Sequence, residues 1–185
     1  MEIVFFGNGN RAYSCLEHLI KNNIMISSII TNEDEILKKP SLIDLAKKSC
    51  IEYLITESPN NIESILFLKK SQPDLFILGG YSKILKQEIL NIPKLFTINL
   101  HGGKLPNYQG SSPINWALIN GETEITISII KVDKGVDTGD ILNELIIPVT
   151  NSDDISSMHD KANTGFHKLL LKTINQINKK TYSLT

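Results

Sequence analysis

Apolar residues in the first hundred positions occur in short continuous runs, separated by segments where they recur every three or four residues. The runs at 3–6, 24–30, 53–55, 74–78 and 96–100 predict strands that are buried on both faces. Helical spacing over 11–21, 41–49, 60–70 and 83–90 predicts a helix before each following strand, and 31–39 is a polar loop. This alternation indicates an α/β fold with a doubly wound, mostly parallel sheet.

The remaining residues follow a different pattern. A short helix is predicted at 115–120, two strands at 126–131 and 140–149, and a last helix at 153–178. No helix separates the two strands, so we expect them to pair antiparallel at the sheet edge. With no repeat or linker, residues 1–185 are predicted to form one catalytic domain that ends in a C-terminal helix.

Polar side chains follow the strand at 96–100. Asn99 and His101 are two residues apart, so they point to the same side of the chain. Ligands of open α/β sheets bind beyond the carboxyl ends of the strands, so both side chains are expected to face a ligand. Gly102 and Gly103 come next and would allow a substrate to approach the backbone closely.

Asp137 lies in a turn, Gly135–Asp140, between the two antiparallel strands. The flanking glycines allow the backbone there a positive φ. A carboxylate beside His101 would orient the imidazole and favour its charged form. The three side chains suit attack of an amine on an acyl carbon: His101 as base or proton shuttle, Asn99 as oxyanion donor, Asp137 as the group that positions His101. The alternative is structural, since an isolated histidine after a strand and an aspartate in a turn have ordinary roles in folding.

With these motifs the chain resembles the formyltransferase family that uses 10-formyltetrahydrofolate. The resemblance rests on Asn99-Leu100-His101, Leu105-Pro106-Asn107-Tyr108 and Asp137-Thr138-Gly139, and extends to 5–7 and 80–85. It implies a Rossmann-like formyltransferase fold, makes Asn99, His101 and Asp137 catalytic, and implies 10-formyltetrahydrofolate as cosubstrate with no metal. By the same analogy, six residues would contact the folate: Lys83, Leu85, Val132, Asp133, Gly135 and Val136.

The resemblance leaves the acceptor open among three branches of the family. The chain ends where methionyl-tRNA formyltransferases add a C-terminal barrel domain, and no such domain is expected here. The run at 112–122 resembles the sugar-nucleotide N-formyltransferases, so the expected acceptor is a dTDP-amino-dideoxyhexose for O-antigen or another surface glycan. The alternatives are methionyl-tRNA or glycinamide ribonucleotide as acceptor, or a non-catalytic relative that binds nucleotide or folate. Little C-terminal material remains for dimerisation, which leaves a homodimer open.

The segment Gly7–Ala12 fits G-x-G-x-x-A after the first strand, a loose dinucleotide signature that on its own suggests an NAD(P) oxidoreductase. Helix N-termini favour phosphate, so Asn8, Asn10 and Arg11 are expected to hold the substrate's pyrophosphate, against the alternative of an ordinary surface arginine. Gly102, Gly103 and Tyr108 complete the expected substrate contacts.

Composition mainly argues against certain partners and kinds of site. The net charge of −1 disfavours a nucleic-acid partner, and Arg11 is the sole arginine among 19 basic residues. Cys15 and Cys50 are far apart, give no metal or disulfide spacing, and are expected to be buried. No signal peptide and no apolar run of about 20 residues is present, so the expectation is a cytoplasmic enzyme without membrane contact.

Overall fold

The computed structural model describes residues 1–185, which divide into two compact units, Met1–Ile98 and Asn99–Thr185. The boundary lies within strand β5, Phe96–His101, so each unit holds one half of that strand. A single domain remains a prediction, and the two units are described separately.

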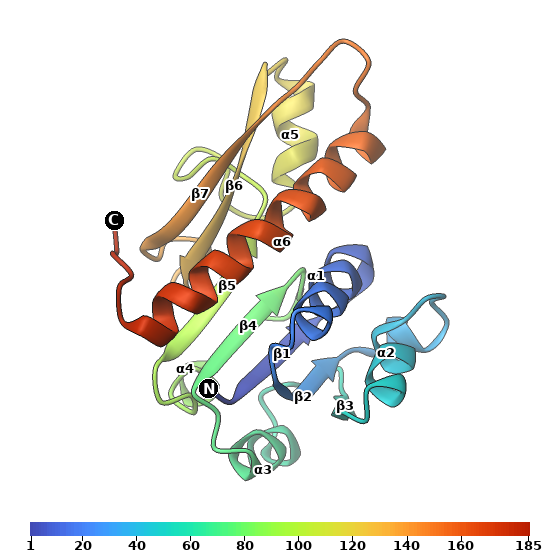
Figure 1. Ribbon diagram of the computed structural model, residues 1–185, viewed down its shortest axis with the longest axis vertical. Helices are drawn as coiled ribbons and strands as arrows, with labels where there is room; N and C mark the ends of the chain where they lie inside the picture. The colour runs from blue at the N-terminus through green and yellow to red at the C-terminus, as the bar shows by residue number, and fades with distance from the viewer. The chain divides into compact units, whose positions relative to one another are not determined.

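The first unit contains four complete strands with helices between them (Figure 1). In chain order the elements are β1 Ile3–Gly7, α1 Gly9–Lys21, β2 Ile26–Thr31, η1 Glu33–Ile36, α2 Leu42–Lys48, β3 Glu52–Ile55, α3 Ile62–Lys70, β4 Leu75–Gly79 and α4 Gln87–Leu90. Strand order is β3-β2-β1-β4, followed by the first half of β5. The pairs β1–β2, β1–β4 and β2–β3 are parallel.

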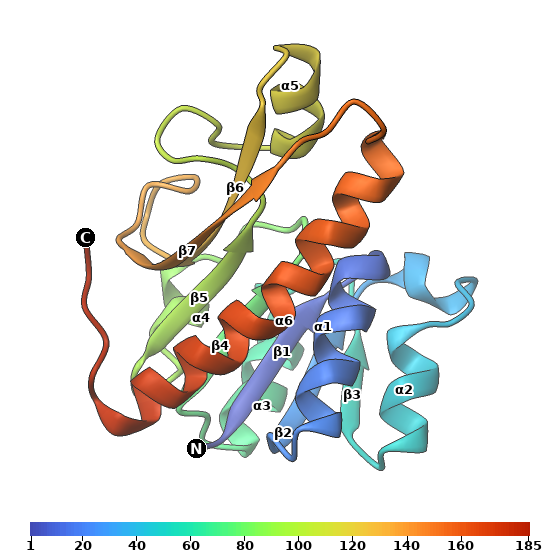
Figure 2. The same ribbon diagram turned by 45° about the horizontal axis from the view of Figure 1, so that its top comes forward.

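Burial explains why these segments form central strands. Every residue of β1 and β4 is buried, as expected for strands covered on both faces. Helices α1 and α2 lie side by side on one face and α3 lies on the other (Figure 2). Right-handed crossovers produce this arrangement, because the chain reverses direction along the sheet between β3 and β4.

Two segments of the first unit differ from the sequence prediction. The helix expected over 83–90 forms only at Gln87–Leu90, because the Asn60 amide donates to the Ile84 carbonyl and its oxygen accepts from the Lys86 amide. These two bonds hold the preceding segment out of a helix. The polar loop at 31–39 contains the short helix η1, whose Glu35 is buried.

The second unit comprises the end of β5, α5 Pro113–Ile119, β6 Glu124–Lys131, β7 Ile141–Pro148 and α6 Ile155–Lys179. Strand β6 lies between β5 and β7 and pairs antiparallel with β7. Helix α6 packs along β6 and β7 (Figure 2), and Gly165 allows close approach because an added Cβ would lie 2.7 Å from Ile127 Cδ1. Asp154 and Ser157 form a capping box that fixes where α6 begins.

The predicted fold class is confirmed: an α/β fold with a doubly wound, mostly parallel sheet and an antiparallel edge. One expectation about a single residue is wrong: Cys50 is exposed, because it follows α2 rather than lying within it. None of the helices is both long and apolar enough to cross a bilayer.

Candidate active site

The three side chains singled out in the sequence meet in the second unit. Asn99 Nδ2 donates to Asp137 Oδ1 at 3.0 Å, and His101 Nδ1 lies 3.2 Å from Asp137 Oδ2. Asn99 and His101 come from the end of β5, and Asp137 from the loop between β6 and β7. The side chain of His101 is 4% exposed and that of Asp137 12%, so the contact is shielded from water. The structure therefore brings Asn99, His101 and Asp137 together.

Several contacts hold His101 and Asp137 in place. His101 Nε2 lies 2.6 Å from the Tyr108 carbonyl oxygen, while Nδ1 faces the Asp137 carboxylate. Asp137 also accepts from Asn99 Nδ2 and from the Gly110 amide, both at 3.0 Å. These contacts fix His101 and Asp137 as a pair.

Residues Tyr108–Gly110, which we call the clasp, run against this pair. In addition to the Tyr108 carbonyl and the Gly110 amide, Gln109 Nε2 donates to the Asp137 carbonyl at 3.1 Å. The Tyr108 hydroxyl donates to Glu122 Oε1 at 2.6 Å and accepts from Asn120 Nδ2 at 3.1 Å. The clasp thus contacts the side chains of both His101 and Asp137.

The loop that carries Asp137 is a tight turn with its own internal bonds. Asp133 Oδ1 accepts from the Gly135 amide at 2.9 Å and from the Thr138 hydroxyl at 2.6 Å. Asp137 itself has φ 53°, a left-handed conformation, whereas neither Gly135 nor Gly139 has a positive φ. Val136 is 59% exposed and Val132 half-buried, so the turn presents apolar surface beside Asp137.

Gly102 and Gly103 are buried immediately after His101. A Cβ on Gly103 would lie 2.6 Å from the Tyr108 carbonyl oxygen and 2.8 Å from His101 Nε2, so the chain's own atoms fill that space. A pocket of about 30 Å³ borders these glycines, Tyr108 and Glu122. That volume holds about one water molecule.

The expected folate contacts of the first unit occupy the segment before α4. The Leu85 side chain is buried, so only its backbone is accessible to a ligand. Lys83 pairs with Glu57 at 2.6 Å, and this hydrogen bond raises the pKa of Lys83. An open groove of about 420 Å³, lined by Asn60, Lys83 and Lys86 among others, adjoins the segment.

The start of α1 carries the residues expected to hold pyrophosphate. Asn8 Oδ1 is buried and has no hydrogen-bond partner, Asn10 is exposed, and burial lowers the pKa of Arg11. The Gly9 amide, however, donates to the buried Glu35 carboxylate at 2.7 Å. An anion binding at that amide would have to displace Glu35, which also weakens the NAD(P) interpretation of the glycine motif.

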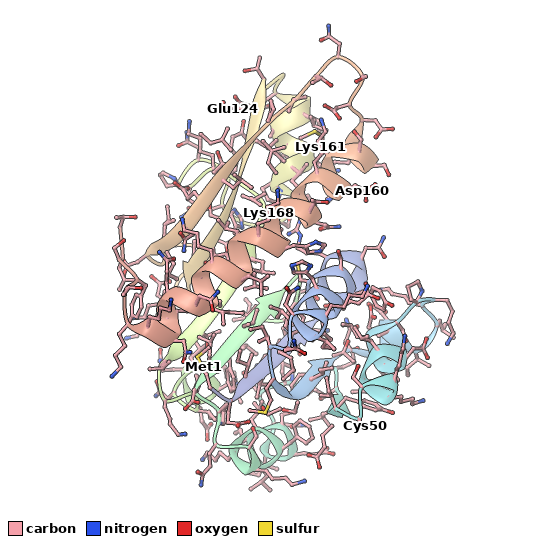
Figure 3. The ribbon with its side chains drawn as sticks, viewed as in Figure 1. Met1, Cys50, Glu124, Asp160, Lys161 and Lys168 are labelled. Atoms are coloured by element: carbon pink, nitrogen blue, oxygen red, sulfur yellow. The ribbon has the colours of Figure 1, made fainter.

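A second hollow, of about 430 Å³, lies between β7 and α6. Leu145 and Ile147 contribute its apolar side, and Asp160, Lys161 and Lys168, labelled on α6 in Figure 3, contribute charge. None of the predicted site residues lines it. No cluster of three metal-ligating side chains occurs in the structure.

Sequence reasoning missed the contacts that the clasp makes with His101 and Asp137. Gln109 lies outside the motifs on which the family resemblance rests, and Glu122 is only the last residue of the run at 112–122. The sequence did offer one sign of a turn here, the glycine at position 110 within a polar segment. In the structure Gly110 has φ 86°, a left-handed conformation that glycine permits.

Comparisons with known proteins give a family match. The family model for formyl transferase matches residues 1–174. Methionyl-tRNA formyltransferase of Caldanaerobacter subterraneus subsp. tengcongensis is 37% identical over 173 residues, which cover 89% of this chain and 56% of that protein.

Solved structures share the fold. Phosphoribosylglycinamide formyltransferase of Bacillus halodurans has a TM-score of 0.83 at 20% identity, covering 96% of this chain and 95% of that one. The Helicobacter canadensis N-formyltransferase, solved with folinic acid and dTDP-3-aminofucose, has a TM-score of 0.77 at 23% identity, covering 98% and 65%. The family match over 174 residues, together with the 37% identity, shows that this chain belongs to the formyl transferase family.

Proposed function

We propose that this chain transfers the formyl group of 10-formyltetrahydrofolate to the amine of a nucleotide-linked amino sugar, of the dTDP-amino-dideoxyhexose kind used for O-antigen and other surface glycans. The observation that carries the proposal is the shielded His101–Asp137 pair, with Asn99 bonded to the same carboxylate. Membership of the formyl transferase family supports the class of reaction. The identity of the acceptor is the more specific part of the proposal.

The chemistry requires one proton to leave the attacking amine and one to reach the departing nitrogen. When bound, the folate supplies a formyl carbon as electrophile. His101 takes a proton from the attacking amine and passes one to the departing nitrogen, so the imidazole returns to its starting state. The Asn99 amide has two N–H groups and uses one on Asp137, which leaves the other for the oxyanion.

The residues named for the folate have properties that fit a pterin ring. The ring is flat, partly apolar and edged with donors and acceptors, and the exposed Val136 offers an apolar contact beside Asp137. Asn60 fixes the backbone on both sides of Leu85, which leaves Lys83 and Leu85 to present backbone groups. We propose that these residues, together with Val132, Asp133 and Gly135, hold the cosubstrate.

A small acceptor is supported by charge. The net charge is −1, and Glu122 and Glu124 line the pocket beside Tyr108 and the two glycines. A polyanion such as tRNA favours a basic surface. We propose that Asn8, Asn10, Arg11, Gly102, Gly103 and Tyr108 contact the nucleotide sugar. A cytoplasmic location follows, because folate and nucleotide sugars are cytoplasmic metabolites.

The test is release of tetrahydrofolate during incubation with 10-formyltetrahydrofolate and a panel of dTDP-amino sugars. We expect His101→Ala to lower turnover by roughly 10²- to 10⁴-fold and Asn99→Ala by roughly 10²- to 10³-fold, with melting temperatures close to that of the wild type. His18→Ala, on α1, is the matched control and should keep full activity. A folded His101→Ala protein with near-normal turnover would contradict the mechanism.

Methionyl-tRNA is the second candidate acceptor, favoured by the 37% identity to a methionyl-tRNA formyltransferase of which this chain spans 56%. The same assay with methionyl-tRNA decides between the two acceptors. Formylation of methionyl-tRNA, with no turnover of any amino sugar, would overturn the sugar proposal and leave the catalytic assignment intact.

A further inference from the structure

The clasp, Tyr108–Gly110, makes two kinds of contact, one through its backbone and one through its side chains. Its backbone meets the catalytic side chains directly, through the Tyr108 carbonyl on His101 and the Gly110 amide on Asp137. Its side chains bond elsewhere: Gln109 to the backbone carbonyl of Asp137, and the Tyr108 hydroxyl to Glu122. The side chains are therefore placed to fix the backbone that touches the pair.

We propose that Gln109 and the Tyr108 hydroxyl are positioning residues for formyl transfer, and that they act through the clasp on His101 and Asp137. The inference rests on the proposed function for its kinetic consequences, but its geometric part concerns this chain alone. It gives Tyr108 a role in aligning the catalytic pair, beyond the substrate contact expected from the sequence.

Gln109 acts on the Asp137 backbone. Asp137 adopts φ 53°, a conformation that residues with a Cβ rarely take, so its backbone needs support. The bond from Gln109 Nε2 to the Asp137 carbonyl and the bond from the Gly110 amide to Oδ2 hold one residue at two points. Together they fix the direction from which the carboxylate meets His101.

The Tyr108 hydroxyl acts on the other end of the clasp. Its bond to Glu122 is short, 2.6 Å, as expected for donation to a carboxylate. The Asn120 bond to the hydroxyl lowers the pKa of Tyr108, but donation to Glu122, burial and the charge of Glu122 together outweigh it and the pKa is raised overall, which keeps the hydroxyl a donor. Because the Tyr108 ring is held in place, the Tyr108 carbonyl is held in place as well, and that carbonyl lies 2.6 Å from His101 Nε2.

The experiment compares four variants of the full chain. Gln109→Met removes the donor at similar volume, Gln109→Arg keeps N–H donors, and Tyr108→Phe removes only the hydroxyl. Asn107→Ala, at an exposed neighbouring residue, is the control. Turnover and KM are measured with both substrates, and ¹⁵N–¹H spectra of the histidine rings are recorded without substrate, with the His101 signals assigned by their loss in His101→Ala.

We expect Gln109→Met and Tyr108→Phe to lower kcat roughly 10- to 100-fold, with the acceptor KM of Gln109→Met changed by less than about threefold. Their His101 ring signals should shift, while Gln109→Arg and Asn107→Ala should resemble the wild type in both measurements. Unchanged kcat and ring signals in Gln109→Met and Tyr108→Phe would overturn the inference. So would a raised KM with normal kcat, which indicates substrate contact.

The two readouts separate this inference from the proposed function. Shifted ring signals in a protein that formylates no amine would support the clasp as a positioning element and contradict the proposed function. Full activity on an amino sugar, with ring signals insensitive to both substitutions, would support the proposed function and contradict the clasp.

Discussion

Gly103 lies close to the ring of His101, the residue proposed as the proton shuttle. An added Cβ would meet the Tyr108 carbonyl oxygen at 2.6 Å, Pro113 Cβ at 2.7 Å and His101 Nε2 at 2.8 Å. One of these contacts is backbone and another is the His101 ring, so relief requires movement of the clasp or of His101. Substitution of Gly103 is therefore expected to affect both stability and turnover.

Replacing Gly103 with alanine is expected to lower the free energy of unfolding by roughly 1–3 kcal/mol, the usual cost of overpacking. We expect formyl transfer to fall as well, because His101 Nε2 is one of the atoms displaced. Urea unfolding and turnover measured on the same preparation test both effects.

Gly121→Ala is the matched control. Gly121 has φ 72° and nothing within 4 Å of an added Cβ, so the change costs only the left-handed strain, roughly 1–2 kcal/mol, and should spare turnover. A Gly103→Ala enzyme that matched this control in both measurements would contradict the crowding argument.

At the scale of single residues, the sequence was most informative where motif and spacing agreed. Asn99 and His101 share a strand, as their spacing predicted, whereas the positive φ of the turn is at Asp137 and not at the flanking glycines. Burial of Cys50 was predicted wrongly, since apolar character says little about which side of a helix end faces solvent. The contact of Gln109 with Asp137 spans 28 residues, and no local pattern indicates such a bond.

At the scale of elements, the segment from Lys83 to Lys86 shows how one side chain overrides helical spacing. Asn60, 24 residues away from Ile84, bonds the Ile84 carbonyl and the Lys86 amide. The apolar residues over 83–90 have helical spacing, but the two long-range hydrogen bonds of Asn60 determine where the helix begins. Elements without such competition, such as β1 and β4, were predicted to within a residue.

We predict that Asn60→Ala raises the KM for 10-formyltetrahydrofolate, because the segment proposed to contact the pterin loses both bonds that shape it. Stability should fall by about 1–2 kcal/mol, as expected for two hydrogen bonds near the surface. Steady-state kinetics with the donor varied, alongside thermal unfolding, measure the two effects.

The neighbouring Asn61 provides the control. Its side chain caps α3 by accepting from the Ser64 amide at 2.8 Å, so Asn61→Ala should cost about 1 kcal/mol of stability without changing the donor KM. Equal changes in KM for both variants would indicate a general loss of stability rather than a local effect on the folate segment.

At the scale of the whole molecule, the alternation of strands and helices determined the fold class, and the same regularity extends through most of the chain. What the sequence did not predict is the buried carboxylate that joins separate loops of the first unit. Glu35 accepts from the Gly9 amide, the Leu42 amide and Lys38 Nζ, and its side chain is 1% exposed. Burial alone raises the pKa of Glu35, but these hydrogen bonds outweigh it and the pKa is lowered overall.

This shift predicts how stability depends on pH. Because the folded pKa of Glu35 is below its ordinary value of 4.5, its contribution is complete above that pH and is lost as the pH falls through the folded pKa. Glu35→Gln should therefore cost roughly 1–3 kcal/mol at pH 7, and the difference from the wild type should shrink in strong acid. Urea unfolding of both proteins at pH 7 and at about pH 3 measures the two differences. A difference that stays constant with pH would contradict the assigned role of Glu35.

The boundary at Ile98 has a consequence for how such genes recombine. The three side chains proposed as catalytic are encoded between codons 99 and 137, within the unit Asn99–Thr185. A crossover inside that stretch would separate side chains that contact one another, whereas one at the boundary would transfer all three together. Natural or engineered chimaeras that exchange the first 98 codons should therefore retain their chemistry more often than those with internal junctions.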